Sequence, residues 1–176
     1  MMHLWETVAG REVLRFQGHQ GAVNAAVFAP GGLQIASAGE DGTVRLWEAL
    51  TGAEARRLEG HEGAVRTVAF SPDGTLLASG GEDGHVILWD VRAGRELRRF
   101  DAHADWVRAI IFTPDGRGLV SSGDDETLAV WDVGTGQLRA RFQPQAGSLL
   151  GLTFLSGGRL LASAGDDQTV RVWELF

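Results

Sequence analysis

Serine, histidine and aspartate, the residue types of a nucleophilic triad, recur at constant spacing along this 176-residue chain. In a triad, aspartate orients histidine, and histidine removes the proton from the serine hydroxyl. An active site is normally assembled once in a domain, whereas this set is complete three times and partly present a fourth time. The repetition therefore favours a structural role over catalysis. The residues, in steps of 42, are His19, His61 and His103; Ser37, Ser79, Ser121 and Ser163; and Asp41, Asp83, Asp125 and Asp167.

Metal and phosphate chemistry have no matching pattern. The repeated histidines are one repeat apart, so they cannot converge on one ion at about 2 Å. The pairs Asp124-Asp125 and Asp166-Asp167 lack the alternating oxygen ligands and closing glutamate of a calcium loop. The chain has no cysteine, which excludes disulfides and thiolate metal sites. We expect no catalytic residue, no cofactor and no metal ion.

Composition narrows the class of partner. The net charge is −7 without a basic stripe, so we expect no nucleic acid partner, because phosphate contacts need clustered arginine or lysine. The sequence lacks both a run of roughly 20 apolar residues and the layout of a signal peptide. This predicts a cytoplasmic protein that does not associate with a membrane. Lysine and tyrosine are both absent, so arginine takes the place of lysine throughout. This bias suggests a GC-rich coding sequence of bacterial origin.

Tryptophan recurs with the same period as serine, histidine and aspartate. Trp5, Trp47, Trp89, Trp131 and Trp173 are 42 residues apart, and an unbroken period of this size marks a repeat architecture. We place the repeats at approximately 6–47, 48–89, 90–131 and 132–173.

Each repeat has the pattern of strands rather than helices. In the second repeat, β-rich stretches alternate with Ser-Pro-Asp-Gly, Glu-Asp-Gly and Arg-Ala-Gly, which are turn signals. This predicts an all-β fold in which each repeat is a four-stranded antiparallel meander. The predicted strands of the second repeat are Val65–Phe70, Thr75–Gly80, His85–Asp90 and Arg95–Phe100.

These motifs resemble the WD-repeat family of β-propellers. The second repeat has Gly60-His61 before its first strand, Ser79, Asp83 in a tight turn, and Trp89-Asp90 closing the third strand. The resemblance implies that each repeat is a propeller blade, with the four residue types joined in one hydrogen-bonded chain. In the fourth repeat Gln145 replaces histidine, so we expect the weakest internal tie there. The implied tetrads are His19, Ser37, Asp41 and Trp47; His61, Ser79, Asp83 and Trp89; His103, Ser121, Asp125 and Trp131; and Gln145, Ser163, Asp167 and Trp173.

The resemblance also implies a partner-binding face, formed by the loop before each first strand and the second-to-third turn. Trp106 is the tryptophan out of phase with the repeat, and exposed tryptophan and arginine dominate interface hot spots. The alternatives are that Trp106 packs against a neighbouring loop and that Arg66 and Arg108 are neutralised by nearby acids. The predicted face comprises Trp106, Arg108, Arg66, Asn24, Leu150, Glu40, Glu82, Asp124 and Asp166.

The two ends of the chain raise the question of ring closure. Segment 7–17 matches the outermost strand of a blade, so residues 1–176 form a single propeller segment whose first strand completes another blade. A homodimer would give an eight-bladed ring with every edge paired. The alternative is a fragment of a longer propeller, which Leu4-Trp5-Glu6 favours because it would compete with Val172-Trp173-Glu174 for one place.

We therefore predict a non-catalytic scaffold that binds a protein or peptide. A sensor module of a larger WD-repeat signalling protein is one alternative. A small-ligand binder or enzyme using the central channel is another, and a polar cluster on the first strands would support it. Those strands are instead mostly apolar: Val23–Phe28, Val65–Phe70, Val107–Phe112 and Leu149–Phe154.

Overall fold

The computed structural model describes residues 1–143 and 147–174, and its strands form successive antiparallel sheets. The all-β prediction with one four-stranded meander per repeat is confirmed for the first three repeats. Blade 1 contains β3 (Val23–Phe28), β4 (Gln34–Gly39), β5 (Thr43–Glu48) and β6 (Glu54–Glu59); blade 2 contains β7 (Val65–Phe70), β8 (Leu76–Gly81), β9 (His85–Asp90) and β10 (Arg95–Asp101); blade 3 contains β11 (Val107–Phe112), β12 (Gly118–Gly123), β13 (Leu128–Asp132) and β14 (Leu138–Phe142).

Two incomplete sheets flank these blades. Blade 4 has three strands, β15 (Leu149–Leu155), β16 (Leu160–Gly165) and β17 (Val170–Glu174), with a short 3-10 turn, η1 (Ser156–Gly158), after the first. This turn stands where repeats 2 and 3 have Pro-Asp-Gly and repeat 1 has Pro-Gly-Gly, and it was not predicted. At the other end, β1 (Met2–Glu6) and β2 (Arg11–Phe16) pair as a two-stranded N-terminal hairpin.

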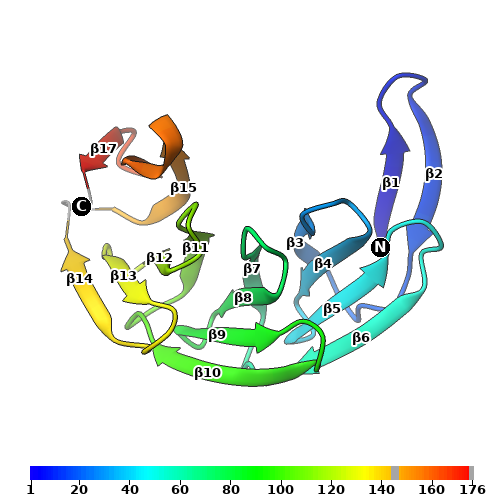
Figure 1. The fold of residues 1–176 in the computed structure, drawn as a ribbon, viewed down its shortest axis with the longest axis horizontal. Helices are drawn as coiled ribbons and strands as arrows, with labels where there is room; N and C mark the ends of the chain where they lie inside the picture. Colours follow the sequence, from blue (N-terminus) through cyan, green and yellow to red (C-terminus); the bar gives the residue numbers. More distant parts are fainter. Residues whose placement is uncertain (144–146, 175–176) are drawn as a thin grey trace.

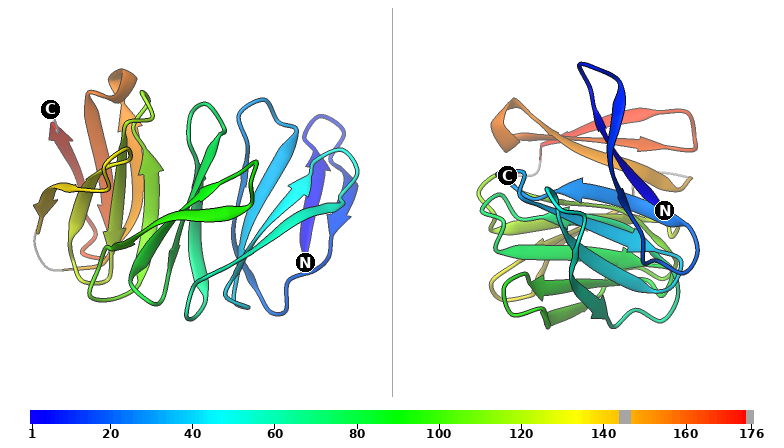
Figure 2. Two further views of the ribbon diagram at one scale, coloured as in Figure 1. Left: turned by 60° about the horizontal axis from the view of Figure 1, so that its bottom comes forward. Right: turned by 90° about the vertical axis from the view of Figure 1, so that its right-hand side faces the viewer.

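The blades are arranged as an open arc (Figure 1). The first strands β3, β7, β11 and β15 lie on its concave side and contact one another in sequence, while β6, β10 and β14 lie on its convex side. Figure 2 shows the blades side by side, with the N-terminal hairpin beyond blade 1 and blade 4 at the opposite end. The chain by itself therefore does not close a ring.

The hydrophobic core lies between the blades. Alternation along each strand places apolar side chains on both faces of a sheet, so consecutive blades bury those faces against each other. Between blades 1 and 2, for example, Val44 and Leu46 pack with Leu77, Ile87 and Trp89 in one buried cluster. Burial of apolar surface between blades is thus the main source of stability.

Blade 4 has an uncovered face. Val170 is 72% exposed and Val172 is 57% exposed, whereas the equivalent Val44 and Leu46 of blade 1 are completely buried. The difference arises because the described chain has no further blade beyond β15, β16 and β17.

The N-terminal hairpin reproduces the last two strands of a blade. Trp5 pairs with Glu12 across the hairpin, just as Trp47 pairs with Glu54 in blade 1. Phe16 of the hairpin packs edge-on against Trp47, with ring centroids 5.8 Å apart. Segment 7–17, which was expected to complete another blade, contains β2. This strand pairs with β1 of the hairpin and not with a β17 strand.

The tight turns between second and third strands are predicted to tolerate substitution poorly. Gly84 has φ +74° and a Cβ there would lie 2.3 Å from the carbonyl oxygen of His103, whereas Gly10 has φ +63° and open space around it. Left-handed backbone costs Gly10→Ala about 1 kcal/mol, and we expect Gly84→Ala to cost at least about 2 kcal/mol more through the clash. Urea unfolding of both variants measures the difference; equal losses would contradict the close packing of this turn.

Candidate functional site

The predicted tetrads of blades 1 to 3 are joined by hydrogen bonds. In blade 2, His61 Nε2 lies 2.8 Å from Ser79 Oγ, His61 Nδ1 lies 2.9 Å from a carboxylate oxygen of Asp83, and Trp89 Nε1 donates to Ser79 Oγ at 2.8 Å. The corresponding distances are 2.7 to 2.9 Å in blade 1 and 2.8 to 3.1 Å in blade 3. Each tetrad ties the loop before the first strand to β4, β8 or β12 and to the strand that follows.

The donors and acceptors of a tetrad have one arrangement that satisfies all of them. The Trp89 indole is a donor only, so Ser79 Oγ accepts from it and has its own hydrogen left to donate. That hydrogen goes to Nε2 of His61, which leaves Nδ1–H to donate to the Asp83 carboxylate. This assigns the tautomer of a neutral histidine from its partners.

The acid–base properties agree with this arrangement. Burial lowers the pKa of His103 and outweighs the neighbouring Asp125 carboxylate, which favours the neutral ring. Burial raises the pKa of Asp83, but hydrogen bonds from His61 and from the backbone N–H groups of Glu62 and His85 outweigh it and hold this pKa well below its usual range. A neutral histidine and a charged aspartate are the forms that the tetrad requires.

The tetrads have triad distances but not a triad environment. Ser37, Ser79 and Ser121 are all completely buried, and each oxygen already accepts a hydrogen bond from a tryptophan. A nucleophile must reach a substrate carbonyl, and these hydroxyls face the interior. Their chemistry is structural: they satisfy buried polar groups that would otherwise be costly.

Threonine extends three of the tetrads, a feature that the motif comparison missed. Thr43, Thr127 and Thr169 each follow the turn aspartate by two residues and donate to its carboxylate at 2.7 to 2.8 Å. The common 42-residue phase of these threonines was the signal available in the sequence.

In blade 4, Trp173 donates to Ser163 at 2.9 Å. Asp167 is paired with Arg171 and Thr169, and these partners lower its pKa to about 2. Gln145, predicted to replace the histidine, lies outside the described residues.

Residues 1–143 and 147–174 contain neither a membrane-spanning helix nor a cluster of metal ligands. No helix in this part of the chain is long and apolar enough to cross a membrane. It likewise contains no group of three or more His, Cys, Asp or Glu side chains placed to hold a metal ion.

Four consecutive segments match the WD domain, G-beta repeat: residues 10–48, 52–90, 94–132 and 136–174. The chain belongs to the WD-repeat family. A search among curated proteins gave no match. WD repeats generally mediate protein–protein interactions, so the surface of these WD repeats is the relevant place to look for function.

The WD-repeat blades bring most of the predicted face together around Trp106. The Arg66 and Arg108 guanidinium carbons lie 4.7 and 4.8 Å from the centroid of the Trp106 ring, within cation–π distance. Arg66 is paired with Glu82, and Arg108 Nε donates to Asp124 at 2.7 Å. We call Asn24, Arg66, Glu82, Trp106, Arg108 and Asp124 the Trp106 surface.

Asn24 connects this surface to blade 1. Its Nδ2 donates to the carbonyl of Val65 at 2.8 Å, and its Oδ1 accepts from Arg66 at 3.3 Å. Arg66 and Arg108 therefore have the acidic partners that one alternative expected. Trp106 lies against these two arginines, which belong to the strands β7 and β11, whereas the other alternative expected packing against a loop.

Three predicted residues have separate surroundings. Glu40 accepts the backbone N–H of Ala22 at 2.9 Å, Leu150 is 51% exposed, and Asp166 is exposed at the turn of blade 4. None of the described contacts links them to the Trp106 surface.

The tetrad protonation states predict how stability depends on pH. The folded pKa of His103 is below its ordinary 6.5, so the unfolded chain binds a proton more readily and the free energy of unfolding falls as pH drops below 6.5. Urea unfolding measures the slope, and ¹⁵N-edited NMR should show the His103 ring protonated at Nδ1 above that pH.

The matched variant is His103→Gln, because the fourth repeat has glutamine at the same position. This variant should lose the part of the slope below pH 6.5 that arises from His103. Identical slopes in both proteins, or a ring protonated at Nε2, would contradict the assigned tetrad.

Proposed function

We propose that the chain is a non-catalytic scaffold whose Trp106 surface binds a protein or peptide partner. The observation that carries this proposal is the position of Trp106 between two arginines that are themselves held by carboxylates. Tryptophan and arginine contribute most to interface hot spots, and here both types are gathered at one place on the arc.

The ion pairs prepare this surface for binding. Association loses free energy when mobile side chains become ordered, and groups that are already fixed reduce that loss. Glu82 and Asp124 restrict Arg66 and Arg108, and the two guanidinium groups restrict the ring between them. Each arginine still has N–H groups beyond those used by its carboxylate, since a guanidinium has five donors.

The charge of the surrounding loops indicates the kind of partner. Besides the two paired acids of the Trp106 surface, the same edge of the blades presents the exposed acids Glu40, Glu62, Asp105 and Asp166. Its guanidinium groups include Arg66 and Arg108, and also Arg45, Arg141 and Arg171, each of which is paired with a turn aspartate. An excess of carboxylates attracts positively charged segments. We expect the partner segment to be basic.

Substitution of Trp106 tests this proposal. A photo-crosslinking amino acid at position 106 would first identify the partner in native cells, after which purified components give a dissociation constant. Trp106→Ala should weaken binding by about 30-fold, corresponding to roughly 2 kcal/mol for a hot-spot residue. The variant should fold, because blades 1 and 2 have Ala22 and Ala64 at this position.

Trp5→Ala is the matched control, because Trp5 is 56% exposed at the N-terminal hairpin, away from the Trp106 surface. It should leave affinity unchanged. Unchanged affinity for Trp106→Ala, or equal losses for both variants, would refute the assignment.

We also propose that a second copy completes the ring of eight blades. Three features support this: β17 has an unpaired outer edge, Val170 and Val172 are uncovered, and β1 and β17 carry equivalent third-strand positions. A β2 strand from a second copy would lie along β17 with Trp173 opposite Glu12 of that copy. Because β1 already holds β2 in this register, it must leave for the exchange.

Light scattering tests the exchange. Removal of residues 1–6 frees the edge of β2, and we expect this variant to have twice the mass of its own shortened chain. The intact chain of 18.9 kDa should dimerise less. Val172→Arg in the shortened chain should restore the monomer, because arginine would be buried against the second copy. A monomer mass for the shortened chain at high micromolar concentration would reject the dimer and favour further repeats in a longer protein.

A further inference from the structure

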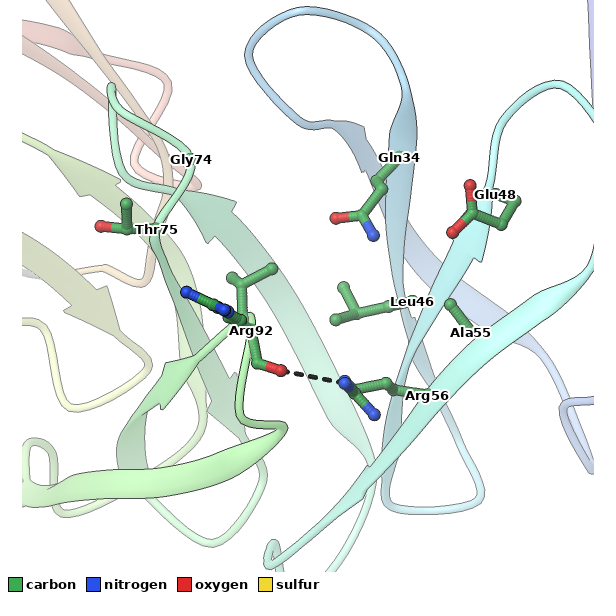
Figure 3. A pocket seen from close by; sticks show the side chains of 9 residues that line it. Gln34, Leu46, Glu48, Ala55, Arg56, Gly74, Thr75 and Arg92 are labelled. Carbon is green, nitrogen blue, oxygen red and sulfur yellow. Dashed lines mark hydrogen bonds between the residues drawn. The ribbon is translucent and has the colours of Figure 1, made fainter.

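A groove lies between blades 1 and 2 at the edge opposite the Trp106 surface. It has a volume of about 460 Å³ and is lined by β4, β5 and β6 of blade 1 and by the two turns at the far ends of β7 and β9 in blade 2. Figure 3 shows Gln34, Glu48 and Arg56 on one side of the space and Thr75 and Arg92 on the other. The tetrads and the Trp106 surface do not use these residues.

Small and polar side chains of blade 1 leave room for the groove. Gln34 and Ala55 occupy the positions of Leu76 and Leu97 in blade 2. Leu76 packs against the core between blades 2 and 3, so the equivalent place between blades 1 and 2 has less apolar volume and a polar amide. Blade 3 has Gly118 and Arg139 at the same two positions, so the residues that line the groove differ from blade to blade and are not imposed by the fold.

The chemistry of the groove combines unpaired charge with an apolar base. Leu46 and Val91 form the base. Arg56 Nη2 donates to the backbone carbonyl of Arg92 at 2.9 Å, which fixes Arg56 but uses one of its five donors. Within the described part of the chain, the ion pairs at 4.0 Å or less include none made by Arg56, Arg92 or Glu48.

These observations favour an anionic ligand. Two guanidinium groups against one carboxylate give the groove an excess positive charge in a chain whose net charge is −7. Arginine pairs with carboxylates through two parallel N–H···O bonds, which are stronger than neutral hydrogen bonds. Leu46 and Val91 add a place for an aliphatic side chain, and Gln34 and Glu48 offer oxygen acceptors for N–H groups.

We propose that this groove binds an extended acidic peptide segment of a partner protein. An aspartate or glutamate of the segment accepts hydrogen bonds from Arg92 and Arg56. The adjacent aliphatic side chain covers Val91, and Gln34 and Glu48 accept from the peptide backbone. The site is independent of the Trp106 surface, because it lies on the opposite edge and selects the opposite charge.

A direct binding experiment tests the groove on the intact chain. The probe is a fluorescein-labelled peptide, Gly-Ser-Asp-Leu-Asp-Leu-Ser-Gly, and its control has lysine in place of both aspartates. Fluorescence polarisation should show binding of the acidic probe that weakens with added salt, as expected for partly exposed charge pairs. The lysine peptide should not bind; equal or tighter binding of the lysine peptide would overturn the proposal.

Two groove variants and two controls locate the binding. Arg92→Ser removes an exposed charge. Ala55→Leu fills the groove with leucine, the residue that blade 2 has at Leu97. Each variant should weaken binding of the acidic probe by at least about tenfold, which corresponds to the loss of one charged hydrogen bond. Leu97→Ala and Trp106→Ala should leave this affinity unchanged. Failure of the acidic probe to bind, or binding unaffected by both groove variants, would refute the site, whereas failure of the Trp106 experiments would leave it intact.

Discussion

Coverage of the two apolar faces of each blade is the constraint on which the rest of this structure depends. A single meander of four strands cannot bury both faces by itself, and repeat proteins gain stability from the interfaces between neighbours. Blades 2 and 3 have a neighbour on each side, and their second and third strands are almost completely buried. The N-terminal hairpin covers blade 1 through Phe16 and Trp47, so the free face of blade 4 is an exception within the described chain.

The tetrads solve a second problem that follows from this burial. Strand ends and tight turns bring polar backbone and side-chain groups next to an apolar interior, where an unpaired group is costly. A serine, a histidine and an aspartate can pass hydrogen bonds from a buried tryptophan to the surface turn, and the same chemical complementarity makes them suitable for a catalytic triad. Burial of the hydroxyl, and not distance, separates the two uses.

Sequence alone predicted what the repeat imposes on every blade. The strands of blade 2 fall within one residue of the predicted bounds, since turn signals and the 42-residue phase define them locally. Features that depend on side-chain conformation were harder to predict from the sequence. The out-of-phase Trp106 was visible, but its place between Arg66 and Arg108 depends on rotamers. The groove between blades 1 and 2 follows from missing volume at Gln34 and Ala55, which a search for conserved motifs overlooks.

The register of the N-terminal hairpin has a kinetic and concentration-dependent consequence. A short turn tethers β1 to β2, so β1 competes at an effective concentration in the millimolar range. The hydrogen bonds that β17 of a second copy could form with β2 have the same pattern as those made by β1, so backbone pairing cannot decide the outcome. The difference is the apolar face of blade 4, with Val170 and Val172. The proposed assembly of two copies would therefore be a balance between a tethered strand and a larger buried surface.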